Sequence, residues 1–161
     1  MHLFRTHNCN ILNSKDVNKF VRLSGWVHRK RNHGLLIFID LRDHYGIIQC
    51  VSNVNSVYFN KINNINLESV ITVDGIVTKR LKKNINYKIQ TGFIEVQIIK
   101  FHIESCSLKL PFDINSDKEC SEELRFKYRF LNLRRKSLPA LMTFLGRVPR
   151  PSLVRFWFKL I

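Results

Sequence analysis

A phenylalanine beside a cluster of cations is the part of this sequence best suited to binding chemistry. Arg29, Lys30 and Arg31 precede a short polar turn, and Phe38 and Asp40 follow it. In sites for unpaired nucleic acid, bases stack on an exposed ring and cations contact the phosphates. The combination therefore predicts a surface for single-stranded RNA.

The exposure of Phe38 depends on the strand that carries it. Residues 35–41 alternate between two faces, one of which holds only apolar side chains, namely Leu35, Ile37, Ile39 and Leu41. We predict that this face is core, which leaves Phe38 partly open to solvent on the face that also carries Asp40. The alternative is that Phe38 packs under a loop, because a bulge or a register slip of one residue exchanges the two faces.

The composition supports a polyanionic binding partner. The chain carries 27 Lys and Arg against 12 Asp and Glu, a net charge of +15 over 161 residues. Such an excess favours nucleic acid over a membrane, although charge alone does not separate DNA from RNA. The alternative for the basic loops is a solvated face that keeps the protein soluble.

Other classes of site are not indicated. The four cysteines, Cys9, Cys50, Cys106 and Cys120, are scattered without a C-x-x-C pair, and the six histidines form no metal-binding motif. We therefore predict reduced thiols and no metal site. Neither a signal peptide nor an apolar run long enough for a membrane span is visible, so we expect a cytoplasmic protein without membrane association.

Strand-like segments are predicted at residues 21–30, 35–43, 47–51, 69–77 and 93–103. Residues 17–20 suit one helical turn, and residues 57–65 suit a short amphipathic helix capped near Ser56. In the last strand the apolar phase changes at Ile99, which indicates a bulge or a barrel corner. Gly25 marks a bend in the first strand.

Three strands, a helix and two further strands are the order of the OB-fold, a mostly β, five-stranded barrel. That fold binds oligonucleotides across its second and third strands and between two loops. The basic turn at 29–31 and the basic loop at 79–84 occupy those loop positions. Phe38 and Gln49 should therefore meet both loops in one groove.

The sequence changes character toward its C-terminus. Residues 124–135 are predicted to form a helix with Leu124, Tyr128 and Leu131 on one side and basic residues on the rest. All 15 asparagines lie at or before Asn132, and no Asp or Glu follows Glu123. Three of the four prolines fall in residues 137–161, which we interpret as a non-native or poorly ordered tail. The alternative for residues 144–161 is a basic amphipathic membrane binder, which its two prolines disfavour.

Several motifs resemble the N-terminal part of bacterial-type aspartyl-tRNA synthetases, over residues 2 to about 136. The matching segments are Arg5-Thr6-His7-x-Cys9, Gly25-Trp26-Val27, residues 38–43, residues 46–49, residues 83–86, Thr91-Gly92-x-Ile94-Glu95-Val96, and the hinge Leu124-Arg125-x-Lys127-Tyr128-Arg129-x-Leu131-x-Leu133-Arg134-Arg135. The resemblance implies an anticodon-binding domain at residues 1–108, a hinge at 109–136, and the tail at 137–161.

The resemblance also implies roles for individual residues in binding the anticodon of aspartate tRNA. Phe38 would stack on a base, and Gln49 and Glu95 would read base edges. The set that would hold bases or backbone is Arg29, Arg31, Arg80 and Asn84. His33 resembles the form found in enzymes that also charge asparagine tRNA. Phe93 and Asn132 depart from the family, which usually has Glu and Asp at these positions.

In that family the hinge precedes a catalytic domain that binds ATP, aspartate and Mg²⁺, for which 161 residues leave no room. We therefore expect a truncated synthetase without cofactors or catalytic residues of its own, and a monomer, because the family's main dimer interface lies in that domain. Enzymatic activity stays open on this basis. The alternatives are a free-standing OB-fold that binds single-stranded RNA, a tRNA-binding accessory protein, and a decayed gene product.

Overall fold

The computed structural model describes residues 4–115 and 121–135. The chain divides into two compact units, Met1–Lys109 and Leu110–Ile161. The predicted tail at residues 137–161 lies outside the described residues.

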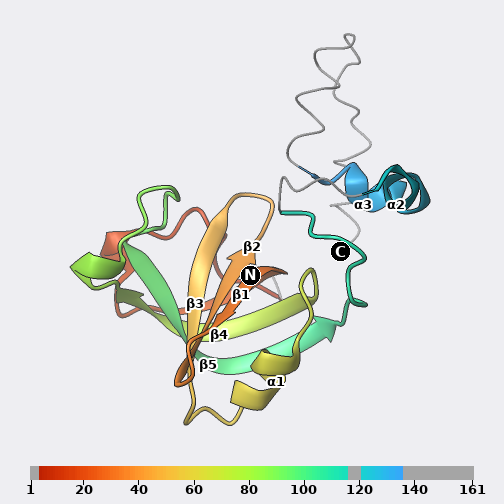
Figure 1. The fold of residues 1–161 in the computed structure, drawn as a ribbon. Coiled ribbons are helices and arrows are strands. Elements are labelled where there is room, and N and C mark those ends of the chain that lie inside the picture. The colour runs from red at the N-terminus through yellow and green to blue at the C-terminus, as the bar shows by residue number, and fades with distance from the viewer. Residues whose placement is uncertain (1–3, 116–120, 136–161) are drawn as a thin grey trace, which may run out of the picture. The chain divides into compact units, whose positions relative to one another are not determined.

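The first unit is a closed barrel of five strands (Figure 1). They are β1 (Phe20–Asn32), β2 (Leu36–Arg42), β3 (Ile47–Asn53), β4 (Val70–Lys79) and β5 (Ile94–Ser105), with the helix α1 (Phe59–Asn64) between β3 and β4. Short 3-10 turns occur at η1 (Ser14–Asp16) and η2 (Lys82–Asn84). The strands follow one another around the ring as β1-β2-β3-β5-β4. This arrangement confirms the predicted five-stranded barrel with a β-β-β-α-β-β order.

The long strand β1 closes the barrel because it pairs with two neighbours. Its first part, from Phe20 to Trp26, lies antiparallel to β4, and its second part, from Trp26 to Asn32, lies antiparallel to β2. Gly25 lies where the strand changes partner, and a Cβ atom there would collide with the carbonyl oxygen of Arg42. The predicted bend at Gly25 therefore corresponds to a close approach of two backbones that only glycine permits.

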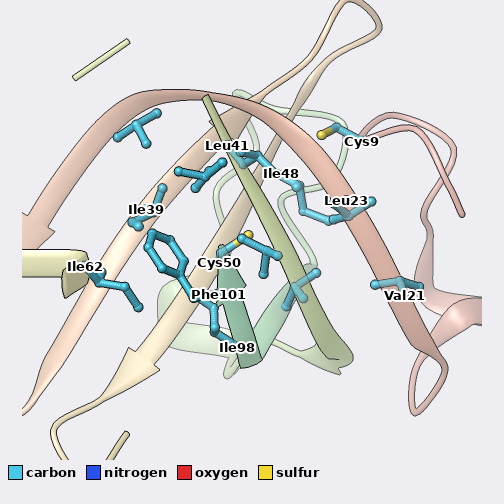
Figure 2. Packing of buried hydrophobic residues seen from close by; sticks show 14 of the residues in the cluster. Cys9, Val21, Leu23, Ile39, Leu41, Ile48, Cys50, Ile62, Ile98 and Phe101 are labelled. Carbon is cyan, nitrogen blue, oxygen red and sulfur yellow. The ribbon is translucent and has the colours of Figure 1, made fainter. Parts of the chain in front are cut away.

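The core confirms the predicted alternation in β2, with one correction. Ile37, Ile39 and Leu41 are fully buried, whereas Leu35 is 70% exposed and does not belong to the core. Leu35 precedes β2 and follows Gly34, whose positive φ of 76° turns the chain before the strand begins. Figure 2 shows Ile39, Ile48, Ile62 and Phe101 converging on the barrel interior.

The predicted phase change in the last strand is a β-bulge. Gly75 of β4 lies opposite Ile98, but the preceding Asp74 lies opposite Lys100, so Ile99 has no opposing residue. Ile99 is 44% exposed, and Phe101 returns to the interior. The bulge lets one strand contribute to the core on both sides of a corner.

The helix predictions for this unit needed four corrections. α1 is shorter than predicted, its N-cap is Tyr58 and not Ser56, and Val57 is 92% exposed instead of packing on the apolar face. Residues 17–20 are not helical, since the turn forms earlier at η1, where Asn13 completes a capping box with Asp16. Ile62 of α1 is fully buried in the barrel core, as predicted for an amphipathic helix.

The second unit contains two short helices instead of the single predicted one. These are α2 (Glu122–Lys127) and α3 (Arg129–Asn132). Tyr128 separates them because its φ of −112° and ψ of 48° depart from helical geometry. Leu131 is buried, in agreement with its predicted side of the helix.

Three of the four cysteines lie among the described residues. Cys9 and Cys50 are buried, Cys106 is exposed, and all three are free thiols. Burial raises the pKa of Cys50 to about 12, so this thiol stays protonated in the core. Residues 4–115 and 121–135 contain no group of three or more His, Cys, Asp or Glu arranged for a metal ion. Over the same residues, none of the helices has the length and apolarity needed to cross a membrane.

Candidate nucleic-acid interface

Polar side chains form a row across four neighbouring strands. In the strand registers, Arg31 of β1 lies opposite Phe38 of β2, and Asp40 of β2 lies opposite Gln49 of β3. The register of β1 against β2 shifts between Val27 and Arg29. Since β3 then pairs with β5, Glu95 continues the row on the next strand. Side chains far apart in the sequence are therefore brought together at this part of the barrel, where Arg31 is exposed, Asp40 and Glu95 are partly buried, and Gln49 is only 7% exposed.

Hydrogen bonds connect this row from end to end. Arg31 Nη2 donates to Asp40 Oδ1 at 3.0 Å and to Gln49 Oε1 at 3.2 Å. Gln49 Nε2 in turn donates to Glu95 Oε2 at 3.1 Å. The contacts fix the orientation of the Gln49 amide, with its oxygen toward Arg31 and its nitrogen toward Glu95. We call Arg31, Asp40, Gln49 and Glu95 the polar row.

Phe38 lies beside the polar row and is partly exposed, as predicted. The Arg31 guanidinium carbon lies 5.9 Å from the centre of its ring, and the His33 ring meets it edge-on at 5.5 Å and 80°. These contacts orient the phenyl ring, which stays partly exposed. The alternative in which Phe38 is sealed under a loop is excluded by its exposure.

Arg80 lies near Glu95 and is itself buried. Arg80 is only 5% exposed. Its Nε donates to the Ile94 carbonyl at 2.8 Å and lies 4.0 Å from Glu95 Oε2. Burial lowers the pKa of Arg80 and raises the pKa of Glu95, because both charges are partly removed from water. Arg80 Nη2 is buried and has no hydrogen-bond acceptor among the described residues.

The structure thus connects five of the seven residues predicted for the site and leaves two outside this network. Arg29 is exposed on β1 opposite Asp40, and Asn84 is exposed at the end of η2. The described contacts do not join the side chain of either residue to the polar row. The sequence placed Asp40 on the same face as Phe38 but assigned it no role in the site. It also missed the contact of His33 with Phe38, which no periodicity reveals.

Comparison with known proteins gives consistent results. The chain is 52% identical over 139 residues to the aspartate–tRNA(Asp/Asn) ligase of Rickettsia africae, covering 86% of this chain and 23% of that protein. It is 48% identical over 148 residues to the ligase of the same name from Paramagnetospirillum magneticum, covering 92% of this chain and 17% of that protein. The chain therefore spans about a fifth of the length of these curated relatives. The predicted resemblance to aspartyl-tRNA synthetases is confirmed.

Solved structures and a family model support the same assignment. The asparaginyl-tRNA synthetase of Pyrococcus horikoshii superposes with a TM-score of 0.69 at 30% identity, over 88% of this chain and 32% of that one. A tRNA anti-codon family model, described as an OB-fold nucleic acid binding domain, matches residues 21–105. That span is more than half of the chain and contains all five strands except the first residue of β1. The chain belongs to this family of OB-fold nucleic acid binding domains.

Proposed function

We propose that the barrel binds the unpaired anticodon bases of aspartate tRNA, and also those of asparagine tRNA, as the tRNA-binding part of an aspartate–tRNA ligase. The observation that carries the proposal is the hydrogen-bonded polar row beside the partly exposed ring of Phe38. The names of the Rickettsia and Paramagnetospirillum relatives, which specify both tRNAs, support the choice of substrate.

The free hydrogen-bonding capacity of the row suits a base edge. Gln49 uses its oxygen and one of its two N–H groups within the row, which leaves a second N–H donor. Glu95 uses Oε2, which leaves Oε1 as an acceptor. The Gln49 donor and the Glu95 acceptor lie side by side. They match a base edge that presents an acceptor next to a donor. A base without those groups leaves both side chains unpaired, which costs about 1–3 kcal/mol for each.

Phe38 and the arginines supply the remaining contributions to RNA binding. A base stacked on Phe38 contributes about 1–3 kcal/mol irrespective of its identity. The buried Nη2 of Arg80 lacks an acceptor among the described residues, and a carbonyl or phosphate oxygen of the RNA would satisfy it. Arg29 and Asn84 lie exposed, available to the backbone of the same strand. Recognition of base edges and contacts to the stacked base or the RNA backbone are therefore made by different side chains.

The test measures binding of the 161-residue chain to hairpins that carry the anticodon stem-loop of aspartate tRNA, with the native or an altered anticodon. The Phe38→Ala variant should bind the native hairpin more weakly by about 1–3 kcal/mol. Phe20→Ala is the matched control, since it removes a ring that is 55% exposed and lies opposite Ile76 of β4. Equal binding of all hairpins by the wild type would reject anticodon reading. It would instead favour a single-strand binder without sequence preference, for which the net charge of +15 suffices.

Four further properties of this chain stay predictions. We expect it to bind tRNA without attaching an amino acid, to need no cofactor, to be a monomer and to be cytoplasmic. An aminoacylation assay with the purified chain, ATP and Mg²⁺ tests the first two. Sedimentation equilibrium tests the third, and cell fractionation tests the fourth. Formation of aspartyl-tRNA by this chain would overturn the first prediction without affecting anticodon binding.

A further inference from the structure

We propose that Tyr87 and Phe93 form a second base-stacking platform, which takes one further nucleotide of the RNA beyond those at Phe38 and the polar row. The inference rests on the proposed function and extends the same site. The two rings meet edge to face, with centroids 5.7 Å apart and planes at 87°. Tyr87 is 80% exposed and Phe93 is 43% exposed. Two adjoining rings open to solvent are a large apolar surface for a protein of this kind to leave uncovered.

The loop that carries the rings is ordered by its own backbone. Asn86 N donates to the Gly92 carbonyl at 3.2 Å, and Gly92 N donates to the Ile89 carbonyl at 3.0 Å. A Cβ atom on Gly92 would collide with the carbonyl oxygen of Asn86, so glycine is needed for this closure. Thr91 Oγ1 donates to the Ile47 carbonyl at 2.5 Å and ties the loop to β3. The backbone that carries the rings is therefore ordered before a ligand arrives, which lowers the entropic cost of stacking.

The platform adjoins the polar row along β5. Phe93 immediately precedes β5, and its carbonyl accepts a hydrogen bond from Arg80 N at 3.0 Å. Lys79 pairs with Ile94, and the bond from Arg80 N to Phe93 continues this pairing by one residue, so Phe93 and Glu95 lie on the same side of the chain and Ile94 on the other. Phe93 is exposed, Ile94 is buried and Glu95 is partly exposed. Two residues along a strand correspond to about 6.6 Å, a separation that an extended RNA strand spans with one nucleotide.

The charges around the rings favour RNA as the occupant. Residues 79–93 contain five Lys and Arg residues and no Asp or Glu. Four of these side chains, those of Lys79, Lys82, Lys83 and Lys88, are exposed. Cations beside a flat apolar surface match phosphates beside a base.

The test uses fluorescence anisotropy with the full chain and the anticodon stem-loop of aspartate tRNA. Tyr87→Ala and Phe93→Ala should each weaken binding by about fivefold to 100-fold, the equivalent of one lost stacking contact. Tyr87→Phe keeps the ring and should bind like the wild type. Leu81→Ala is the matched control, because Leu81 is a 73% exposed apolar residue of the same loop without a ring, and it should change binding by less than about twofold. Tyr87 is too exposed for its truncation to unfold the barrel, so its result stands even if Phe93→Ala is unstable.

Hairpins with a single abasic nucleotide at each loop position locate the stacked base. At one position, the difference between wild type and Phe93→Ala should disappear, and that position should differ from the one at which Phe38→Ala loses its effect. Normal binding by both ring variants, with weakened binding by Phe38→Ala, would overturn the platform and leave the proposed function intact. The same loop position for both residues would also overturn it. Weakened binding by the ring variants without anticodon preference would support the platform and reject the proposed function.

Discussion

Replacing Glu95 with glutamine removes a charge from the polar row while keeping the shape of the side chain. Burial raises the pKa of Glu95 above its ordinary value of 4.5. A raised carboxyl pKa means that the folded state favours the protonated form, so at neutral pH this carboxylate opposes folding. Glutamine has no such cost, and its oxygen can still accept the hydrogen bond from Gln49. Glu95→Gln should therefore be at least as stable as the wild type at pH 7.

RNA binding should respond in the opposite way. A hydrogen bond to a carboxylate contributes about 1.5–3 kcal/mol, against about 0.5–1.5 kcal/mol for a neutral acceptor. The cognate hairpin should thus lose about 1 kcal/mol, which is roughly a fivefold weaker affinity. A hairpin with an altered anticodon never makes this bond, and the loss of one negative charge strengthens its attraction to the protein. The ratio of the two affinities should fall by about fivefold or more.

Anisotropy titrations of both hairpins at one salt concentration measure this ratio, and thermal melts measure stability. Glu104→Gln is the matched control, because it removes a carboxylate from the same strand at a position where Glu104 accepts a hydrogen bond from Thr72. This control should strengthen binding of both hairpins equally. The same uniform gain in Glu95→Gln would refute the assignment of Glu95 to a base edge.

Three further predictions concern the barrel and its charge. Gly25→Ala should lower the free energy of unfolding by about 1–3 kcal/mol in urea titrations, because the new methyl group collides with the Arg42 carbonyl; unchanged stability would mean that the strands separate easily there. Hydrogen bonds from Arg22 hold the pKa of Asp74 below its ordinary value of 3.8, so their stabilisation is present above that value and is lost as pH falls through the lowered pKa. Asp74→Asn should accordingly lower the melting temperature at pH 7, and this effect should shrink as the pH falls through the lowered pKa; a loss that does not change with pH would exclude this ion pair as the cause. Lys82→Ala should reduce the slope of log affinity against log salt by about 0.7–0.9 without changing the preference among anticodons, if its exposed ammonium contacts one phosphate.

The strands were predictable because a barrel wall separates an apolar face from a polar one. In β2, Ile37 and Ile39 alternate with Phe38 and Asp40, and the core leaves no other register. The error at Leu35 arose at the end of the strand, where the turn at Gly34 and not the alternation decides the direction of the side chain. Periodicity determines the middle of an element better than its ends.

The site was only partly predictable for a related reason. Phe38 lies on a strand whose faces can be assigned from the sequence. The predicted order of the fold supplied Gln49, and the resemblance supplied Glu95 and Arg80. The link through Asp40 depends on the strand register, which places Asp40 opposite Gln49. The meeting of Tyr87 and Phe93 depends on the path of a loop closed by backbone hydrogen bonds. Neither of these contacts leaves a periodic signal in the sequence.

The shortest ladder of the barrel lies between β3 and β5, where only two residue pairs, Cys50 with Val96 and Val51 with Gln97, are in register. Gln49 and Glu95 stand on opposite sides of this seam and bridge it through their side chains. An RNA that binds both residues would link β3 and β5 where their pairing is shortest. Bound RNA should then slow amide hydrogen exchange in β3 and β5 before it does so in the other strands, because it stabilises the pairing of these two strands.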